Sequence, residues 1–547
     1  MEKRLLLAMV LSILVLLLFQ FLFIKPPRPQ VGSQMSKEEP IPEEKPGEMK
    51  SFEAIPSIII PEALVGEEEK EITVTTSLYT AKWKNRGAVL TSWRLNRYLD
   101  ETNQPLEVVS SLAELLKVYP LSLRLEDKSL ENVANQAIYR ESKDSLSLAD
   151  GEKGELKFYY SDGKSVYIIK TFIFRGGSYD FEVEISLYKD GRQVDFLVIW
   201  GPGIGYHQLP GGKIGSLESG GVAFYWPPKV LRLAEKKLKE QKVEYTSLLW
   251  AAYEDNYTAA LFLFPENQGR AHFFKESIAL PETGQTISGY FLGTNPPKII
   301  RIGPKEIDSL KSFGYETKKL INFGFFGAIV EVLLLGLKAF YRFIPNWGVA
   351  IILMTLVVKI IFFPLTYSST KSMAKMQELQ PKIKALQAKY KKARRDLEER
   401  RKLNEEMMRL YKEHGINPAA GCLPILIQLP VFIAFYRLLV IAIELRRSPF
   451  ILWIKDLSSR DPYYILPILM GITQYISQKM VPTSADPTQR RLTLIMPIFM
   501  TIIFINFQSG LVLYWLTNNV LQIIQQYLMN RLMRRKKSQV HGKKSKK

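Results

Sequence analysis

The sequence predicts a polytopic α-helical membrane protein with six spans, five of which form a core bundle, a large extracytoplasmic antiparallel β-sandwich domain and a cytoplasmic helical hairpin. Three observations predict this fold class. Long apolar runs hold much of the 47% hydrophobic content, which is typical of spanning helices. Residues 55–315 are rich in short β-forming segments. A strongly basic segment, 371–415, lies between the second apolar run and the last four.

The composition narrows the class of function. The chain has 547 residues and a net charge of +20, and basic residues in membrane proteins mark cytoplasmic loops and anionic partners. Its single cysteine, Cys422, excludes an intramolecular disulfide. Zinc-ligand spacing, a phosphate loop and a nucleophile-elbow motif are all missing from the sequence. We therefore expect no metal, no cofactor and no use of bound ATP.

Residues 1–24 are predicted to form an N-terminal transmembrane anchor. Their apolar run, 5–24, is longer than the core of a usual signal peptide, and it is followed by Lys25-Pro-Pro-Arg-Pro rather than by a small-residue cleavage site. A cleaved signal peptide is the alternative. Residues 25–54 are rich in Pro, Glu and Lys, which predicts a disordered linker.

Residues 55–315 are predicted to form one large antiparallel β-sandwich. Asp162-Gly163 and Asp190-Gly191 each separate two β-rich runs and predict two-residue hairpin turns, in which both central residues have positive φ. Five aromatic residues could line a sugar-binding cleft, although core positions are the favoured interpretation: Trp83, Trp93, Trp200, Tyr225 and Trp226.

Residues 316–343 are predicted to form an amphipathic helix that lies in the membrane interface. Glu331, Lys338 and Arg342 interrupt its apolar run at spacings of seven and four, near one helical face. A spanning helix is the alternative, and it would invert the topology of all that follows.

Residues 344–530 are predicted to form the five-helix core. Its first span, within 348–371, carries Lys359 near its midpoint. An ammonium group at that depth costs about 3 kcal/mol on insertion scales, so we expect it to face water or a partner inside the bundle. The other predicted spans are 423–443, 463–480, 492–507 and 511–528, and Pro430, Pro467 and Pro497 are expected to kink or end helices.

The basic segment 371–415 is predicted to be a helical hairpin in water. It holds 14 Lys or Arg and 7 Asp or Glu, a net charge of +7. Apolar residues at helical spacing predict two helices with a turn near 391–396: Met373, Met376, Leu379, Ile383 and Leu386 in the first, and Leu403, Met407 and Leu410 in the second. The tail 531–547 carries nine Lys or Arg and no acid, and we expect it to be disordered. Both segments suit anionic surfaces.

The charge distribution predicts the orientation. Placing the hairpin and the tail in the cytoplasm gives both termini on that side and the β domain outside. The loop 446–461 then lies outside with a net charge of +2, which is a smaller excess than that of the hairpin or of the tail.

Polar residues of the predicted spans cluster in the cytoplasmic half. They predict a substrate groove that is open to the cytosol and closed on the outer side: Lys359, Thr355, Gln428, Gln478, Trp515, Asn518 or its neighbour Asn519, and Gln522. Hydrogen bonds between helices are the alternative role, and they suit Gln474 and Asn506. They suit Lys359 poorly, since no membrane carboxylate is available to it.

A positively charged recess part-way across a bilayer suits transient capture of an acidic or polar peptide segment. The apolar flank of that segment would then enter lipid along the spans 423–443 and 492–507. An intramembrane peptidase with Lys359 as general base is a second hypothesis, but Ser368 and Ser369 lie near the membrane edge. A solute transporter is a third, and it is weakened by the missing acids.

Several long motifs of this chain resemble those of the YidC family of membrane-protein insertases. They are Pro364-Leu-Thr, Ser372-Met-Ala-Lys-Met, Leu379-Gln-Pro-Lys-Ile, Asn417-Pro-Ala-Ala-Gly-Cys-Leu-Pro, Gln428-Leu-Pro, Asp461-Pro-Tyr-Tyr-Ile-Leu-Pro and Ser509-Gly-Leu-Val-Leu-Tyr-Trp. The resemblance covers almost the whole chain. It implies an insertase and chaperone of the bacterial inner membrane, with no enzymatic activity, that acts on nascent membrane proteins alone or with the Sec translocon.

The resemblance also implies a periplasmic β-supersandwich, contact of the basic tail and hairpin with ribosomes, and contact with anionic lipids. The groove arginine of the family falls on Lys359, its groove threonine on Thr355 and its late-span aromatic on Trp515. Lysine keeps the charge of arginine but lacks its planar donor fork. Cys422 matches a cysteine of the family.

Overall fold

The computed structural model describes residues 58–100, 102–205, 220–235, 243–279, 286–390, 396–415, 423–480 and 487–544. The predicted anchor 1–24, the linker 25–54 and Cys422 lie outside these residues. The chain divides into two compact units: Pro56–Lys371 with Ala419–Lys547, and a smaller unit that contains Ser372–Pro418. Each is described by itself.

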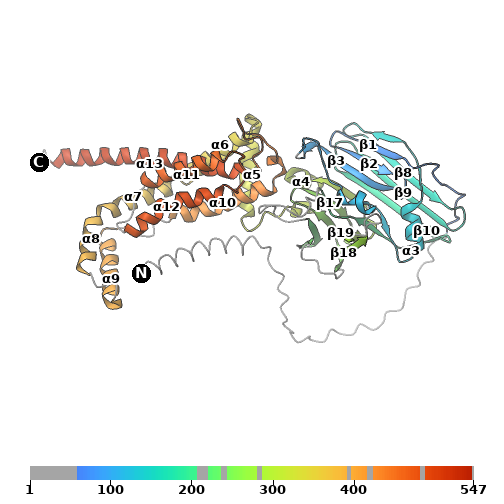
Figure 1. Ribbon diagram of the computed structural model, residues 1–547, viewed down its shortest axis with the longest axis horizontal. Coiled ribbons are helices and arrows are strands. Elements are labelled where there is room, and N and C mark those ends of the chain that lie inside the picture. The colour runs from blue at the N-terminus through green and yellow to red at the C-terminus, as the bar shows by residue number, and fades with distance from the viewer. Residues whose placement is uncertain are drawn as a thin grey trace. The chain divides into compact units, whose positions relative to one another are not determined.

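The β domain contains three sheets (Figure 1). The first has the strand order β4-β3-β2-β1-β7, with β1 Glu71–Thr75, β2 Tyr79–Lys84, β3 Val89–Leu99, β4 Pro105–Glu107 and β7 Ser145–Ser147. The third has the order β15-β18-β19-β12-β5, with β5 Leu123–Arg124, β12 Leu197–Trp200, β15 Val243–Leu248, β18 Gly269–Ala279 and β19 Thr286–Thr294.

The second sheet is the largest and follows the order β14-β13-β16-β17-β20-β10-β9-β8-β6, with β11 on β10. Its strands are β6 Arg140–Glu141, β8 Lys153–Ser161, β9 Val166–Arg175, β10 Asp180–Lys189, β11 Arg192–Gln193, β13 Gly221–Trp226, β14 Lys229–Ala234, β16 Trp250–Glu254, β17 Thr258–Leu263 and β20 Ile299–Pro304. All described strand pairs are antiparallel except β1 with β7.

The large sheet shares its core with both small ones. Trp83 on β2 packs on Phe172 of β9 with ring centroids 4.3 Å apart, and Tyr253 on β16 packs on Phe273 of β18 at 6.0 Å. Strand β10 alternates buried Phe181, Val183, Ile185 and Leu187 with polar residues, as expected of a strand with one face in the core. The predicted antiparallel β domain is therefore confirmed, although a single sandwich was too simple: three sheets pack around the core.

The two predicted hairpin turns differ. Asp190 and Gly191 have φ of 52° and 76°, and Lys189 pairs with Arg192, so this turn has two residues as predicted. The other prediction was wrong, because four residues separate Ser161 from Val166. The Asp162 carboxylate accepts the backbone N–H groups of 164, 165 and 166, and these hydrogen bonds stabilise the longer loop.

Four of the five aromatic residues considered for a sugar-binding cleft are core residues, as the favoured interpretation held. Trp83, Trp93, Trp200 and Tyr225 are buried, whereas Trp226 is exposed at the turn between β13 and β14. These buried rings are therefore not available to a ligand at the surface.

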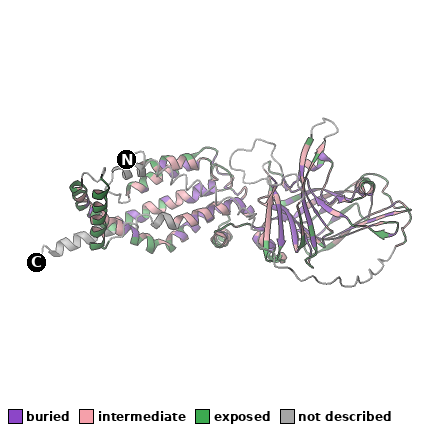
Figure 2. Ribbon diagram, turned by 90° about the horizontal axis from the view of Figure 1, so that it is seen from below, coloured by how far each residue is buried: buried purple, intermediate pink, exposed green. Residues whose placement is uncertain are grey.

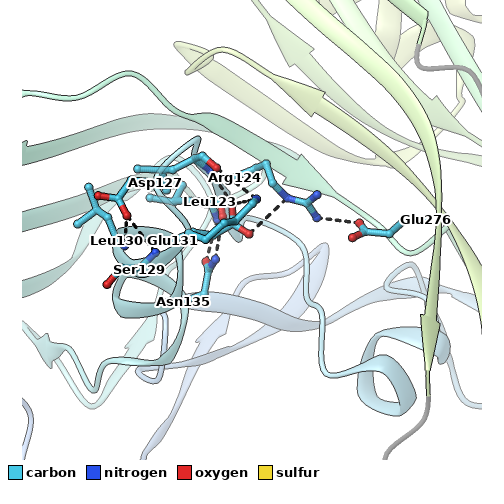
Figure 3. A network of polar contacts seen from close by, with 10 residues as sticks. Leu123, Arg124, Asp127, Ser129, Leu130, Glu131, Asn135 and Glu276 are labelled. Atoms are coloured by element: carbon cyan, nitrogen blue, oxygen red, sulfur yellow. Dashed lines mark hydrogen bonds and ion pairs between the residues drawn. The ribbon is translucent and has the colours of Figure 1, made fainter. Parts of the chain in front are cut away.

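Short helices close the edges of the β domain: α2 Leu112–Leu116, α3 Lys128–Gln136 and α4 Ile307–Phe313. Helix α3 is held by the polar network of Figure 3. Asp127 caps it by accepting the backbone N–H groups of Ser129 and Leu130. The amide of Asn135 bonds both backbone groups of Leu123, and Arg124 donates to Glu276 on β18 at 2.8 Å. The network ties α3 to two strands of the third sheet.

The helical bundle follows the β domain in the chain. Its elements are η2 Thr317–Leu320, α5 Gly327–Phe343, α6 Trp347–Ile361, α7 Phe363–Glu378, α10 Leu423–Ile441, η5 Ile443–Leu445, α11 Ile465–Met480, α12 Pro487–Phe504 and α13 Ser509–Lys544. All of them except α7 contribute to one apolar core, which also includes residues of β13, β16 and β17. Helix α5 packs closely on α6, because a Cβ atom at Gly336 would lie 2.7 Å from the sulfur of Met354. The predicted helices 423–443, 463–480, 492–507 and 511–528 correspond to α10, α11, α12 and the first half of α13.

The predicted single helix through Lys359 is wrong. Helices α6 and α7 meet at a bend of 60° around Phe362, so Lys359 lies in the last turn of α6 rather than at a midpoint. Pro364 explains the bend, because its ring lacks an N–H and clashes with the carbonyl one turn earlier. Among the described residues, this bent pair has the combined length and apolar composition to cross a membrane, and no single helix does.

The tail also differs from its prediction. Helix α13 continues to Lys544, through residues expected to be disordered. The physical reason is that residues 531–541 are mostly Arg, Lys, Leu, Met and Gln, which favour helix, with neither proline nor glycine among them.

The smaller unit contains the predicted helical hairpin. Helices α8 Gln380–Lys389 and α9 Leu397–Glu413 are held by a small apolar cluster of Met376, Leu379, Ile383, Met407, Leu410 and Tyr411. Tyr390 donates to Glu406 at 2.6 Å across the two helices. Five of the eight apolar residues predicted from the spacing lie in this cluster, whereas Met373, Leu386 and Leu403 are not among its members.

Apolar side chains are distributed differently in the bundle and in the β domain. Figure 2 shows exposed residues, in green, along the helices. Large apolar residues are among the exposed ones on α6, α7, α11, α12 and α13: Leu356, Ile360, Ile361, Phe363, Ile468, Ile472, Ile495, Ile498, Ile502, Ile524 and Leu528. Exposed apolar surface of this extent marks contact with a membrane or a partner.

Candidate functional site

The Lys359 ammonium group lies between α6 and α13. It donates to Gln522 Oε1 at 2.7 Å and to Asn518 Oδ1 at 3.1 Å. These two amides are one turn apart on α13, so their side chains reach the same point. None of the ion pairs among the described residues includes Lys359. The charge is therefore held by neutral oxygens, as expected from the absence of a membrane carboxylate.

The local sequence of α6 explains how Lys359 is positioned. Helix α6 begins at Asn346, whose side chain accepts the N–H of Val349, and its apolar residues Ala350, Ile351 and Met354 face the core. Lys359 and its two amide partners are only partly buried. The ammonium group can therefore exchange its present partners for water or for another acceptor without unfolding the helix.

Thr355 is not brought into contact with Lys359. Its hydroxyl is buried and donates to the carbonyl of Ile351 in its own helix at 2.6 Å. This is the common back-bond of a helical threonine, and it satisfies the hydroxyl without a ligand.

Gln428 also lies apart from the lysine. Its amide donates to the hydroxyl of Tyr514, which is buried and stacks on Phe435 with ring centroids 4.3 Å apart. The contact joins α10 to α13. Gln428 thus has a helix-to-helix role in this structure, and Tyr514 is a partner that the sequence analysis missed.

The polar residues on the other face of α13 join it to α11. Trp515 donates to Gln474 at 3.1 Å, and Asn519 donates to the carbonyl of Met470 at 3.2 Å. Of the two adjacent asparagines, Asn518 is therefore the one at Lys359. The alternative role proposed for Gln474, a hydrogen bond between helices, is confirmed.

Gln478 has no contact with this set. Its side-chain oxygen is buried without a hydrogen-bond donor within the described part of the chain. Of the seven predicted site residues, the structure thus brings together Lys359, Asn518 and Gln522. Trp515 and Gln428 bond other residues of the bundle, and Thr355 bonds its own backbone.

A second cation of the bundle was missed. Arg437 on α10 donates to the carbonyl of Asn322, in the segment before α5, at 2.8 Å. A charged residue inside an apolar run is the same signal that pointed to Lys359, so the sequence could have revealed it. Glu444 pairs with Lys338 of α5 at 2.8 Å.

Aromatic rings join α10 to α12. Phe432 of α10 lies 5.9 Å from Phe504 of α12, and Tyr436 of α10 lies 5.7 Å from Phe507 in the segment after α12, between ring centroids. Trp515 of α13 packs on Phe432 at 5.0 Å. Rings without strong polar bonds can slide past one another, so this seam is easier to part than a hydrogen-bonded one.

The titratable residues do not suggest a metal site. No group of three or more His, Cys, Asp or Glu residues in the described ranges could hold a metal ion. The described hydrogen-bond acceptors of Lys359 are Asn518 and Gln522, and neither is a serine. The arrangement offers a cation and amide groups for polar recognition rather than a nucleophile with its base.

Two family models match the chain, and similar proteins cover its length. The model described as "60Kd inner membrane protein" matches residues 339–537, and that described as "YidC periplasmic domain" matches 71–335. A protein named "Membrane protein insertase YidC" from Geobacter metallireducens is 36% identical over 97% of this chain and 98% of its own. One of the same name from Geobacter sulfurreducens is 35% identical over 97% and 98%.

A solved structure is also similar to this chain. The crystal structure of an active YidC insertase with its first transmembrane domain resolved shares 22% identity, with a TM-score of 0.37. The similarity covers 86% of this chain and 95% of that one.

Proposed function

Because the chain belongs to the YidC family of membrane protein insertases, we propose that it inserts segments of nascent membrane proteins into the bacterial inner membrane and assists their folding. The relatives carry the name of an insertase, which supports a non-enzymatic role and leaves the peptidase and transporter hypotheses without support. The inner-membrane location follows from the family.

The observation that carries the mechanism is the environment of Lys359. Its ammonium group is held by two side-chain amide oxygens, in a bundle whose outward faces are apolar. A client carboxylate would be a stronger acceptor than either amide, since its negative charge adds a Coulomb attraction to the hydrogen bond from the ammonium group. The acidic or polar segment of a client would displace the amides and be held there transiently.

The apolar surface of the bundle explains how the client is released from the site at Lys359. While the polar segment is held, the apolar segment of the client can lie along α10 and α12, where aromatic rings form the contact. Each buried CH₂ group contributes about 0.8 kcal/mol, so a segment of ordinary span length gains enough by entering lipid to leave the site.

The proposed topology has six spans, with both termini cytoplasmic and the β domain, 55–315, in the periplasm. The bent pair of α6 and α7 and the exposed apolar residues of α11, α12 and α13 support several crossings. Helix α5 is proposed to lie in the interface, since Val332, Leu335 and Phe343 form an exposed apolar stripe opposite its buried face.

The proposed groove includes Lys359, Asn518 and Gln522, with Thr355, Gln428, Gln478 and Trp515 along its walls, and it opens to the cytosol. The proposed partners are the Sec translocon and the ribosome, with the basic hairpin and tail at the ribosome and at anionic lipids. The net charge of +7 on 371–415 and the nine basic residues of 531–547 support these contacts.

Depletion of the protein tests this function. We expect membrane insertion of a short client with an acidic tail to fail on depletion and to be restored by the wild-type chain. Lys359→Arg should restore it, since the charge is kept, and Lys359→Ala should restore it poorly. Normal insertion after depletion would contradict the function, whereas full rescue by Lys359→Ala would contradict only the role of the charge.

A further inference from the structure

Two adjacent turns at the α5–α6 end of the bundle expose large aliphatic and aromatic side chains. Phe343 and Ile344, between α5 and α6, are 86% and 44% exposed. Ile451 and Leu452, in the segment between η5 and α11, are 52% and 80% exposed. We call these four residues the apolar wedge. None of them has a side-chain polar atom that could compensate for contact with water.

The two turns form one structural feature. The side chain of Asn346 donates to the carbonyl of Phe450 at 2.9 Å, which links the turn before α6 to the second turn. The ring of Phe450 also lies so close to Gly348 that a Cβ atom there would be 2.0 Å from it. The two turns that carry the four wedge residues are therefore joined at Phe450.

The second turn is rigid and its conformation is unusual. The N–H of Phe450 donates to the carbonyl of Ile454 at 3.0 Å, and that of Ile454 donates to Ile451 at 3.1 Å. Leu452 has a φ of 54°, a left-handed conformation that bulky residues rarely adopt. Its neighbours Phe450 and Trp453 pack toward the core of the bundle. The turn thus directs its most apolar residue outward at a conformational cost, as functional sites often do.

The surroundings identify the partner. The wedge continues the exposed apolar stripe of α5, formed by Val332 and Leu335. Exposed cations flank it on both turns: Arg342 directly precedes Phe343, and Lys455 follows Leu452 by three residues. Apolar side chains with basic residues at their edge match the acyl chains and phosphates of a phospholipid leaflet.

We propose that the apolar wedge inserts into the bilayer leaflet nearest the β domain, with Arg342 and Lys455 at the level of the lipid phosphates. The wedge would fix the depth of the α5–α6 junction and of the loop before α11. This inference rests on the proposed membrane location, and it adds a lipid-binding surface to the part of the chain between η5 and α11.

Spin labels can test this proposal in the full chain, since Cys422→Ser leaves no other cysteine. Labels are placed by Leu452→Cys and Phe343→Cys in vesicles of phosphatidylethanolamine and phosphatidylglycerol. Ile498→Cys on the exposed face of α12 is the lipid reference, and Lys164→Cys in the turn after β8 is the water reference. We expect oxygen to relax the wedge labels strongly and a water-soluble nickel complex to relax them weakly. The label at Ile498 should give the same result.

Three outcomes would overturn the proposal. Nickel relaxation at Leu452 as strong as at Lys164 would place the wedge in water while leaving the insertase function intact. Protection of Leu452 from both oxygen and nickel would show that it is covered by another protein chain, which is either a second copy of this chain or a partner. Nickel relaxation at Ile498 as well would contradict the membrane location itself, and the wedge with it.

Discussion

Lys170 in the β domain and Lys359 in the helical bundle are both held by oxygen atoms that carry no charge. Lys170, on β9, is fully buried, and its ammonium group donates to the backbone carbonyls of Gly87, Ala88 and Leu121 at 2.7, 3.2 and 3.2 Å. Burial lowers the pKa of Lys170 to about 7. Its three acceptors are backbone carbonyls of buried turns, so they cannot rotate away as side chains can.

The acceptors of Lys359 are side chains. Asn518 and Gln522 can rotate about their own bonds while α13 stays folded, and all three groups are only partly buried. An ammonium group is therefore fixed by backbone carbonyls in one region and held by rotatable side chains in the other, where we propose that it binds clients. A charge without a carboxylate partner indicates a binding site only where its acceptors are free to leave.

The two regions also differ in where they keep apolar side chains. Among the described aromatic residues of the β domain, only Trp226 and Tyr315 are exposed, whereas the helices expose rows of isoleucine and leucine. A β domain in water and a bundle in lipid explain this difference. Water favours burial of apolar side chains, whereas lipid favours their exposure and requires polar groups to be paired inside the bundle.

Replacing Lys170 is expected to have the largest effect on stability. Lys170→Met leaves three buried carbonyls without a donor, which should lower the free energy of unfolding of the β domain by about 3 kcal/mol. Thermal unfolding of the purified full chain, monitored by near-ultraviolet circular dichroism, measures this. Lys359→Met is the matched control, and it should change the stability by less than about 1 kcal/mol. Equal losses of unfolding free energy in the two variants would contradict the claim that the two lysines have different roles.

The stability of the β domain is expected to depend on pH through Lys170. Its pKa is about 7 when folded and 10.5 when unfolded, so between these values the unfolded state binds one more proton. Stability should therefore rise with pH from about 7, by at most about 1.4 kcal/mol per pH unit. The contribution of this group is constant below about pH 7. Subtracting the profile of Lys170→Met isolates it, and identical profiles would show that the group does not titrate there.

Replacing Lys359 is expected to act on insertion instead. Lys359→Met should slow insertion of a client with an acidic tail by about tenfold, which corresponds to about 1.4 kcal/mol of lost charge-assisted hydrogen bonding. Lys359→Arg keeps the charge and should retain most of the rate. The rate is measured from protease protection of the client in vesicles. A client whose tail carries no acid should be inserted equally by all three proteins.

The smallest effect is expected at the amides of α13. Gln522→Leu removes one of the two acceptors of Lys359. We therefore expect the insertion rate of a client with an acidic tail to change by about threefold, or about 0.7 kcal/mol. Asn519→Leu is the matched control on the same helix, since Asn519 is buried against α11. It should lower stability and leave the dependence on client acidity unchanged. An effect of Asn519→Leu on that dependence would argue that the whole helix, rather than one face, recognises the client.

The sequence predicts the site well where a short-range pattern determines it. A cation in an apolar run, and amides one turn apart on a later helix, were enough to bring Lys359, Asn518 and Gln522 together. The same spacing argument could not decide that Gln428 bonds Tyr514 or that Thr355 bonds its own helix, since both depend on side-chain rotation. Arg437 carried the same signal as Lys359 and was missed.

The fold shows the same limit. Apolar spacing identified the helices and the α8–α9 contacts, and Pro364 marks the bend that the single-helix prediction omitted. The division of the β domain into three sheets could not be predicted, because it depends on pairs far apart in the chain. Strand β20, for example, lies between β10 and β17, and β5 pairs with β12. Local propensity says nothing about such partners.

The central claim is that Lys359 lies in a groove that opens to the cytosol. Measuring from which side of the membrane a water-soluble reagent can react at position 359 tests this claim most directly. In a Cys422→Ser background, Lys359→Cys can be treated with a membrane-impermeant thiol reagent, added to sealed vesicles from the side of the hairpin or from the side of the β domain. We predict reaction from the hairpin side alone. Reaction from the β-domain side, or from neither side, would contradict a groove that opens to the cytosol and presents an exchangeable charge.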